Sequence, residues 1–406
     1  MVGIPTALAN PERVSANSVV IGGGLAGLVA AYRLSRTGRN TVLVDMPPVD
    51  PQGGLGGFAR FSGAKFSLPP AGLGLLPIAG SHAALNQVAN EVLALLGLAQ
   101  RADYLSSQNH SVLPASDTFT LRAYQSLVLR PDEVDAVLSR LQSLLESEIE
   151  IVVGRCTSLS RTASGWMAGI DTPLGFSKQL ESPVVIYAGG RSTSVLLRQA
   201  GAQPQIGKGL DVGFRIEFQD KGALTKLRSF GPDAKIIKNE CRTFCLNYPG
   251  EVFRYEYEEL SIPGGVVAHE GYPGANVGIL CRVKQKPEML SRIRSVLPRV
   301  KQQHPRLELH ASDQELSETL TDLYGANVSQ QLVSFSHQLV HDGLIRWSEP
   351  HIVHVPLVDW HWDVYAEDES FATTVSGLHV IGDSSGHARG LLQAAMSGWL
   401  VADTLG

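Results

Sequence analysis

The clearest hydrophobic pattern lies near the start of the chain. A largely apolar run over 18–21 leads into glycines, and apolar residues then recur at helical spacing through Leu25, Leu28 and Val29. A second apolar run covers 40–44. Continuous runs rich in β-branched residues are typical of strands buried on both faces of a parallel sheet. The pattern therefore predicts a strand, a tight turn, a helix and a second, parallel strand.

Further along, the chain alternates between helical and strand periodicity. Apolar stripes predict helices over 81–96, 131–145, 194–200, 287–300, 313–324 and 391–404. Buried runs predict strands over 149–153, 166–170, 183–187 and 378–381, and alternating residues predict antiparallel strands within 213–281 and 344–365. The fold class we expect is α/β: a Rossmann-like domain with a parallel sheet, carrying an inserted domain with a mixed or antiparallel sheet.

Three glycines in the first turn form the spacing G-x-G-x-x-G. Gly22 permits the tight turn, Gly24 lets a pyrophosphate approach the backbone, and Gly27 lets the helix pack closely on the strand. The next strand ends in Asp45, where an acid can accept the ribose hydroxyls and would repel the 2′-phosphate of NADP. The order of elements favours a dinucleotide site over an unrelated glycine-rich turn, but the motif alone does not separate NAD from FAD.

Three other segments carry small residues where a ligand would lie. A glycine-rich run over 53–65 is either a flexible loop or backbone close to a ligand, with Ser62 and Lys65 supplying a hydroxyl and a positive charge. The strand over 183–187 ends in small residues, as a nucleotide crevice requires or as an ordinary turn allows. In the last segment, Asp383 can bind a polyol hydroxyl, and the amides of the following helix can face a developing negative charge.

Composition excludes several classes of function. The 406 residues are 44% hydrophobic and 18% charged, with a net charge of −5. Without a basic stripe or a long apolar run, we expect no nucleic-acid partner and no membrane span. Four cysteines fit a reducing cytoplasm.

Neither the histidines nor the cysteines have the spacing of a metal or redox site. His351 and His354, with His361, lie on a predicted strand where residues three apart face opposite ways, so we expect no metal. Cys241 and Cys245 lack the Cys-x-x-Cys spacing and are either buried thiols or a redox pair.

These motifs resemble the FAD-binding elements of glutathione-reductase-like flavoproteins. More narrowly, the chain resembles the uncharacterised bacterial FAD-dependent dehydrogenases. The matching residues are Gly56, Gly57, Phe61, Ser62 and Lys65, then Gly213, Arg215 and Glu217, then loosely Phe244, Cys245 and Gly250, and a C-terminal match over 377–402. Two departures are the shorter Asp45 in place of the usual Glu, and a cysteine-rich segment reduced to Cys241 and Cys245.

The resemblance implies FAD as the cofactor and assigns roles to particular residues. Asp45 would bind the adenosine ribose, the backbone of Cys156 would meet the adenine, and Asp383 would hold the ribityl chain or pyrophosphate. Leu391 and Leu392 would lie near the flavin pyrimidine ring. The full set of expected FAD contacts is Gly22, Gly24, Leu25, Ala26, Gly27, Asp45, Met46, Gly56, Gly57, Arg60, Phe61, Ser62, Cys156, Ala188, Gly189, Gly190, Gly382, Asp383, Gly390, Leu391 and Leu392.

The expected domains are discontinuous along the chain. They are an N-terminal extension over 1–16, an FAD-binding domain over 17–80, 131–212 and 373–406, and a substrate domain over 81–130 and 213–372. Candidate walls of the substrate cavity are Arg215, Arg254, Tyr255, Trp360 and Trp362.

The leading functional hypothesis is an FAD-dependent dehydrogenase or oxidase. It would take a hydride or electron pair from a small organic substrate and pass electrons to oxygen or another acceptor. His387 and Lys65 are the candidate catalytic residues, His387 because a neutral imidazole can take a proton near pH 7. No second G-x-G-x-x-G provides an NAD(P)H module. The alternatives are an FAD-dependent monooxygenase using NAD(P)H, a protein stabilised by a non-catalytic flavin, and an RNA-modifying flavoprotein, which the charge disfavours.

Overall fold

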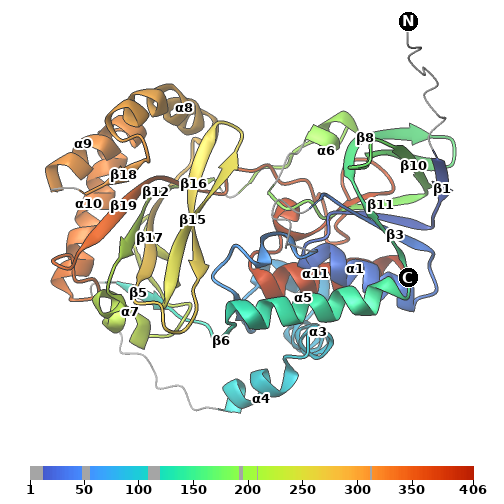
Figure 1. Cartoon of the computed structure of the whole chain (residues 1–406), viewed down its shortest axis with the longest axis horizontal. Helices are drawn as coiled ribbons and strands as arrows, with labels where there is room; N and C mark the ends of the chain where they lie inside the picture. The colour runs from blue at the N-terminus through green and yellow to red at the C-terminus, as the bar shows by residue number, and fades with distance from the viewer. Residues whose placement is uncertain (1–11, 48–54, 108–118, 192–194, 208, 311–312) are drawn as a thin grey trace, which may run out of the picture.

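The computed structural model describes residues 12–47, 55–107, 119–191, 195–207, 209–310 and 313–406. Most of the expected extension, and parts of the glycine-rich run, therefore lie outside the described residues. The described chain forms two lobes, each built on its own sheet (Figure 1). Within the described residues, no helix has both the length and the apolar character needed to span a membrane.

The first lobe contains a five-stranded parallel sheet in the order β20-β11-β2-β3-β7. Its strands are β2 (Ser18–Ile21), β3 (Thr41–Asp45), β7 (Glu150–Val153), β11 (Val184–Tyr187) and β20 (Leu378–Val380). Four helices lie on one face: α1 (Leu25–Arg36), α3 (His82–Leu95), α5 (Pro131–Glu146) and α11 (Leu391–Leu405). A second sheet covers the other face, with β1 (Glu12–Ser15) parallel to β10 (Ser177–Ser182) and antiparallel strands β9 (Gly165–Asp171) and β8 (Arg155–Thr162).

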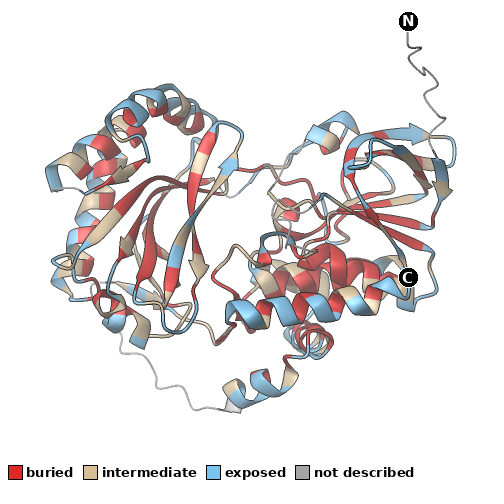
Figure 2. Cartoon of the chain, viewed as in Figure 1, coloured by how far each residue is buried: buried red, intermediate tan, exposed pale blue. Residues whose placement is uncertain are grey.

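Burial on both faces explains the continuous apolar runs of the parallel strands. Val20 and Leu43 pack into the core under the helices, whereas Val19, Val42 and Val44 pack into the core under the second sheet. Neighbouring residues of a strand point to opposite faces, so both sets must be apolar. Figure 2 shows buried residues along these strands and along most of α11. The predicted Rossmann-like domain is confirmed.

The second lobe is built on a seven-stranded sheet in the order β18-β19-β12-β17-β14-β13-β5. The strands are β5 (Thr120–Arg122), β12 (Leu210–Phe218), β13 (Lys235–Lys238), β14 (Cys241–Asn247), β17 (Ala275–Val283), β18 (Glu308–Leu309) and β19 (His351–Asp359), all in antiparallel pairs. Helices α8 (Lys286–Gln303), α9 (Asp313–Tyr324) and α10 (Ala326–His341) share a hydrophobic core with this sheet. A long hairpin, β15 (Gly250–Tyr257) and β16 (Leu260–Val267), lies beside it.

Short elements complete the described chain. They are β4 (Lys65–Ser67), β6 (Ser126–Val128), α2 (Leu76–Ala79), α4 (Ala99–Ser107), α6 (Val195–Gln199), α7 (Thr225–Ser229) and four 3₁₀ turns at Gly57–Ala59, Leu73–Leu75, Lys221–Leu224 and Gly382–Ser385.

Two differences from the expected domain boundaries lie in the first third of the chain. Residues 12–15, expected in the extension, pair with β10 as β1. Residues 81–130, expected in the substrate domain, are divided: α3 packs against α11, whereas β5 joins the second sheet. The apolar face of α3 finds its partner in the helical layer of the first lobe, which the sequence of α3 alone does not reveal.

Helices α1 and α11 approach each other closely through a glycine. A Cβ built on Gly398 of α11 would lie 2.1 Å from the carbonyl oxygen of Ala26 and 2.9 Å from the amide nitrogen of Ala30. Neither backbone atom can move without shifting α1. The contact therefore requires glycine at this position.

We expect Gly398→Ala to destabilise the protein even though alanine favours helices. Overpacking against a fixed backbone costs about 1–3 kcal/mol, which exceeds the gain of about 1 kcal/mol in helix propensity. The measurement is the free energy of unfolding from denaturant titration. Gly271→Ala is the control, because its Cβ would lie no closer than 3.6 Å to the nearest atom, and a change within about 0.5 kcal/mol is expected there. Equal stability of Gly398→Ala and the wild-type protein would contradict the packing argument.

Candidate functional site

The glycines of the first turn occupy positions that match their expected roles. Gly22 has φ +112°, and its Cβ would lie 2.6 Å from the carbonyl oxygen of Ala188. A Cβ on Gly27 would lie 1.9 Å from the carbonyl oxygen of Gly22, so the helix can start against the strand only with glycine here. A Cβ on Gly24 would meet nothing within 4 Å. Gly24 therefore faces open space at the start of α1, where no side chain caps the helix.

Asp45 is held beside this turn by the backbone. Its Oδ1 accepts a hydrogen bond of 2.8 Å from the amide of Gly23. Burial raises the pKa of the Asp45 carboxyl, and the amides of Gly23 and Met46 oppose that shift. The next residue, Met46, is 43% exposed. The backbone of the first turn thus holds the Asp45 carboxylate at the end of β3.

The segment expected to meet the adenine lies alongside Asp45. Val153 at the end of β7 is the register partner of Asp45, and the amide of Gly154 donates to the carbonyl of Asp45 at 2.8 Å. Cys156 follows at a bulge in β8, with its side chain in the core. Burial raises the pKa of its thiol to about 12, so the thiol stays protonated and the backbone is the part of this residue suited to a base edge.

The described part of the glycine-rich run is folded onto the first turn. Gly56 forms a bridge with Gly24, and its amide donates to the carbonyl of Gly23 at 2.9 Å. A Cβ on Gly57 would lie 3.1 Å from the Cα of Gly24. Residues 56 and 57 are therefore ordered against the first turn, and the expected closeness of this backbone to a ligand stays a prediction.

The rest of this segment joins the two lobes. The Arg60 guanidinium pairs with Asp135 at 2.7 Å, and the Phe61 ring stacks on Phe253 of the hairpin with centroids 4.9 Å apart. The Ser62 hydroxyl donates to the carbonyl of Ala59 at 2.9 Å. All three side chains have partners within the protein. Their expected place beside a cofactor stays a prediction.

Lys65 reaches away from the first turn into the second lobe. Its ammonium group donates to the carbonyl oxygen of Leu246 in β14. Burial raises the pKa of the neighbouring Cys245 thiol, but Lys65 and Arg215 outweigh burial and lower the pKa overall. A catalytic role of Lys65 stays a prediction, and the structure shows Lys65 in contact with backbone.

Two residues expected to line the substrate cavity form hydrogen bonds within the second lobe. Arg215 is 1% exposed and donates to the carbonyls of Pro263 and Cys245 and to the amide oxygen of Asn276. Arg254 donates to the carbonyls of Ser261 and Val355. Both guanidiniums tie strands together, in contrast to the expected substrate contacts.

The end of β11 and the segment after β20 both meet the first turn at one edge of the sheet. The amide of Ala188, after β11, donates to the carbonyl of Ile21 at 2.7 Å. The amide of Ile381, after β20, donates to the carbonyl of Tyr187 at 3.0 Å. Gly189, Gly190, Gly382 and Asp383 follow directly. The structure therefore brings the ends of β2, β3, β11 and β20 together, as parallel strand order requires.

Helix α11 begins at this edge as well. Gly390, with φ +110°, precedes its first residue Leu391, and no side chain caps the helix. Leu392 is fully buried. Gln393 fixes the start of the helix by donating to the carbonyl of Ser67 at 2.8 Å. His387 lies in the preceding loop with its ring edge-on to Phe371, centroids 6.0 Å apart. Its catalytic role stays a prediction.

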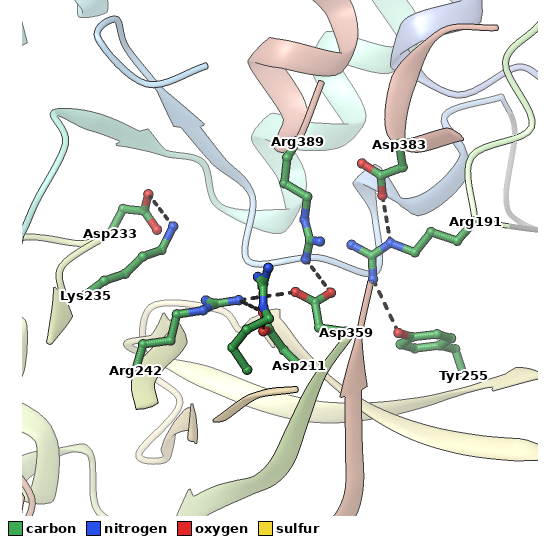
Figure 3. A network of polar contacts seen from close by, with 10 residues as sticks. Arg191, Asp211, Asp233, Lys235, Arg242, Tyr255, Asp359, Asp383 and Arg389 are labelled. Carbon is green, nitrogen blue, oxygen red and sulfur yellow. Dashed lines mark hydrogen bonds and ion pairs between the residues drawn. The ribbon is translucent and has the colours of Figure 1, made fainter. Parts of the chain in front are cut away.

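A charged and aromatic cluster that the sequence did not indicate lies between the lobes (Figure 3). Arg191 pairs with Asp383 at 2.7 Å and donates to the Tyr255 hydroxyl at 3.3 Å. The Trp362 indole donates to the carbonyl of Asp383 at 3.0 Å, and the Arg191 guanidinium lies 4.6 Å from its ring. Tyr255 and Trp362, two expected wall residues, thus reach the Gly382–Asp383 motif. The one available signal was position: Arg191 directly follows Gly190.

The histidines and cysteines considered as metal or redox sites have other partners in the structure. His354 pairs with Glu217 at 2.9 Å, and His351 packs on Trp347 with centroids 4.4 Å apart. Cys241 on β14 is the register partner of Cys281 on β17, so its nearest cysteine in the sheet comes from another strand. Among the residues that the structure describes, no group of three or more His, Cys, Asp or Glu side chains could hold a metal ion.

Comparison with known families finds a match within the first lobe. Residues 20–71 match the NAD(P)-binding Rossmann-like domain family. The chain contains a Rossmann-like nucleotide-binding domain. The matched region runs from β2 through the first turn and β3 to the residues after β4, which are the elements assembled at the sheet edge. No curated protein matches the sequence.

Solved structures with a similar fold include three enzymes or flavoproteins. OxyS anhydrotetracycline hydroxylase from Streptomyces rimosus is 14% identical over 97% of this chain and 63% of that chain, with a TM-score of 0.44. A flavoprotein/dehydrogenase from Cytophaga hutchinsonii is 12% identical over 97% and 79% of the chains (TM-score 0.44), and p-nitrophenol 4-monooxygenase PnpA from Pseudomonas putida DLL-E4 is 14% identical over 97% and 79% (TM-score 0.41). This chain spans just under two thirds of the hydroxylase. Similarity at this level assigns no reaction.

Gly24→Val is expected to yield protein without FAD, because the larger side chain would fill the open space through which a diphosphate reaches α1. We expect the affinity for FAD to fall at least about tenfold, equivalent to about 1.4 kcal/mol. Visible absorbance after gel filtration measures bound flavin, and chromatography after denaturation identifies it. Gly207→Val is the matched control, since a Cβ there also meets nothing within 4 Å. Loss of flavin from both variants alike would refute the site-specific explanation.

Acidification is expected to weaken FAD binding through Asp45. Burial raises the pKa of this carboxyl in the protein, and ribose hydroxyls bond best to its ionised form. Affinity should be full above that pKa and fall about tenfold per pH unit below it. Asp45→Asn should bind FAD more weakly at neutral pH and lose this dependence, as measured by titrating apoprotein with FAD at several pH values. An unchanged acid limb in the variant would assign it to another group.

Proposed function

We propose that this protein is an FAD-dependent oxidoreductase that removes a hydride or electron pair from a small organic substrate. The observation that carries the proposal is the meeting of four motifs at one sheet edge: the first turn, Asp45, the end of β11 and the segment after β20. A mononucleotide would need only the first two. A site that continues to the start of α11 suits a longer dinucleotide.

The residues present fit FAD. The open space at Gly24 and the uncapped start of α1 suit a diphosphate, because helix N-termini favour anions. Asp45, held beside the first turn by the amide of Gly23, would accept the hydroxyls of the adenosine ribose. Asp383 would hold the ribityl chain, and the uncapped start of α11 would face the ring end. When bound, the flavin supplies the two-electron chemistry.

The chain's own residues supply orientation and charge at that end. The dipole of α11 and its first amides stabilise negative charge that develops nearby. The hairpin β15–β16 brings Tyr255 to Arg191 beside the Gly382–Asp383 motif. Burial raises the pKa of the Tyr255 phenol, so it stays neutral and can donate a hydrogen bond. The inserted lobe would therefore close the site over a substrate.

Dehydrogenase or oxidase chemistry is favoured over the monooxygenase alternative by the single dinucleotide motif in the sequence. Electrons would enter from the substrate rather than from NAD(P)H and leave to oxygen or another acceptor. A monooxygenase would need a separate way to bind NAD(P)H at this flavin.

Anaerobic mixing tests the assignment. We expect the purified protein to contain FAD, and neither NADH nor NADPH alone to bleach its visible absorbance at catalytic rates, whereas a substrate does so. Rapid bleaching by NADH or NADPH would replace this proposal with the monooxygenase. A protein that binds NAD but not FAD would overturn the cofactor assignment. Flavin that no substrate or acceptor cycles would indicate a structural role.

A further inference from the structure

Two arginines reach from the first lobe toward the second, each beside a cofactor motif. Arg191 follows the end of β11, and Arg389 precedes the start of α11. In Figure 3 both guanidiniums extend toward the region above Asp359, at the end of β19. Arg389 donates to Asp359 at 2.6 Å, so the pair joins the two lobes.

The hydrogen bonds of Arg389 are incomplete. Its Nη2 bonds to Asp359, but its Nη1 is buried and has no hydrogen-bond partner in the part of the chain that the structure describes. A buried donor without a partner is costly, because it has lost its hydrogen bonds to water and gained none in the protein. A ligand with an acceptor oxygen would remove this cost.

Asp359 does not use up the positive charge around it. Asp359 is 2% exposed and also lies 3.5 Å from Arg242. Burial raises the pKa of its carboxyl, and the nearby guanidiniums, Arg389 foremost, outweigh burial and hold it well below its usual range. The cluster consists of four arginines and three aspartates, which are Arg191, Arg242, Arg282, Arg389, Asp211, Asp359 and Asp383. These seven side chains together carry one net positive charge.

Aromatic rings form the surroundings of this incomplete arginine. Trp360 and Trp362 stack with centroids 5.3 Å apart, and the Arg389 guanidinium lies 5.0 Å from each ring. The ring of Phe244, on β14, has its centroid 5.8 Å from the Arg389 guanidinium. Trp360 has φ +61°, a costly conformation for a bulky residue, which is commonest at functional sites. The cluster thus combines a cation with flat apolar surfaces.

The imidazole of His361 lies beside Trp362, with ring centroids 5.1 Å apart. His361 is 3% exposed, and neither ring nitrogen has a hydrogen-bond partner within the described residues. Burial, and then the charge of Arg191, lowers the pKa of His361 well below its usual range, so it stays uncharged. A neutral imidazole adds a donor and an acceptor without adding charge.

We propose that the site binds an organic carboxylate, with the carboxylate bonded to Nη1 of Arg389 and its apolar body against Trp360 and Trp362. The inference rests on the proposed function, since it names the substrate class of that site. Arginine suits this role because its planar donors match carboxylate geometry. The diphosphate of FAD has its own place at Gly24 and α1. Arg389 is instead tied to β19 of the inserted lobe, on the substrate side.

The test uses benzoate as the probe and benzamide, its uncharged analogue, as the matched control. Binding is measured on the purified protein by calorimetry and by the change in the visible spectrum of the flavin. We expect saturable binding of benzoate and none of benzamide. Arg389→Gln should weaken benzoate binding at least about tenfold, with FAD content unchanged, and Arg389→Lys should weaken it less.

Arg282→Gln is the control for charge, because Arg282 belongs to the same cluster but pairs with Asp211 instead of Asp359. We expect it to bind benzoate within about twofold of the wild-type protein. If Arg389→Gln does not fold, Arg389→Gln combined with Asp359→Asn removes both charges of this ion pair together and should lose benzoate binding in the same way.

The outcomes separate this inference from the proposed function. Absence of benzoate binding, or equal binding by Arg389→Gln, would overturn the carboxylate site while leaving the FAD assignment standing. Loss of FAD from Arg389→Gln would show that the guanidinium serves the diphosphate and would also overturn it. Benzoate binding to protein that takes up no FAD would support the anion site and reject the proposed function.

Discussion

The close contact at Gly27 is the constraint on which the first lobe depends. With any side chain at that position, α1 could not begin directly against the end of β2, because the Cβ would occupy the place of the Gly22 carbonyl oxygen. The same helix is packed from its other side by α11, again through a glycine, Gly398. Because α1 and α11 lie on the same face of the sheet, these two contacts fix how closely α1 approaches both the end of β2 and its neighbour α11. They also bring both helix starts to the same sheet edge.

Burial of the parallel sheet on both faces has a second consequence. Val19 and Val20 belong to different cores, as do Val42 and Leu43. A sheet with apolar residues on both sides leaves no face for polar chemistry, so polar groups can gather only where the strands end. Asp45 and Asp383 stand at such ends, and each contacts the backbone or a side chain of another segment at that edge. The location of the candidate site thus follows from the layering.

Local pattern was sufficient for the dinucleotide motif of the first lobe and insufficient for the contacts between lobes. The strand, glycines, helix and Asp45 are close in sequence, and each has a physical requirement that its residue type reveals. Arg191 and Asp383 are separated by 192 positions, so nothing local indicates that they meet. The positive charge of Arg215 made it a candidate substrate-binding residue, yet its guanidinium is buried and donates to backbone carbonyl oxygens. Helix α10 was not predicted, since its sequence mixes Ser, Gln and Val with an apolar stripe whose partner strands lie far away along the chain.

The charges between the lobes connect the fold to the proposed chemistry. A buried carboxylate such as Asp359 is costly to place away from water and is tolerated because guanidiniums surround it. Those guanidiniums come from both lobes: Arg242 from β14 and Arg389 from the segment before α11. Arg389 contacts Asp359 through one nitrogen only, so its planar fork can hold a second anion without releasing the first. The ion pair that joins the lobes would then also set the distance between a bound carboxylate and the start of α11. Under the proposed function, Arg389 would therefore both bind the carboxylate of the substrate and determine where the reacting carbon lies.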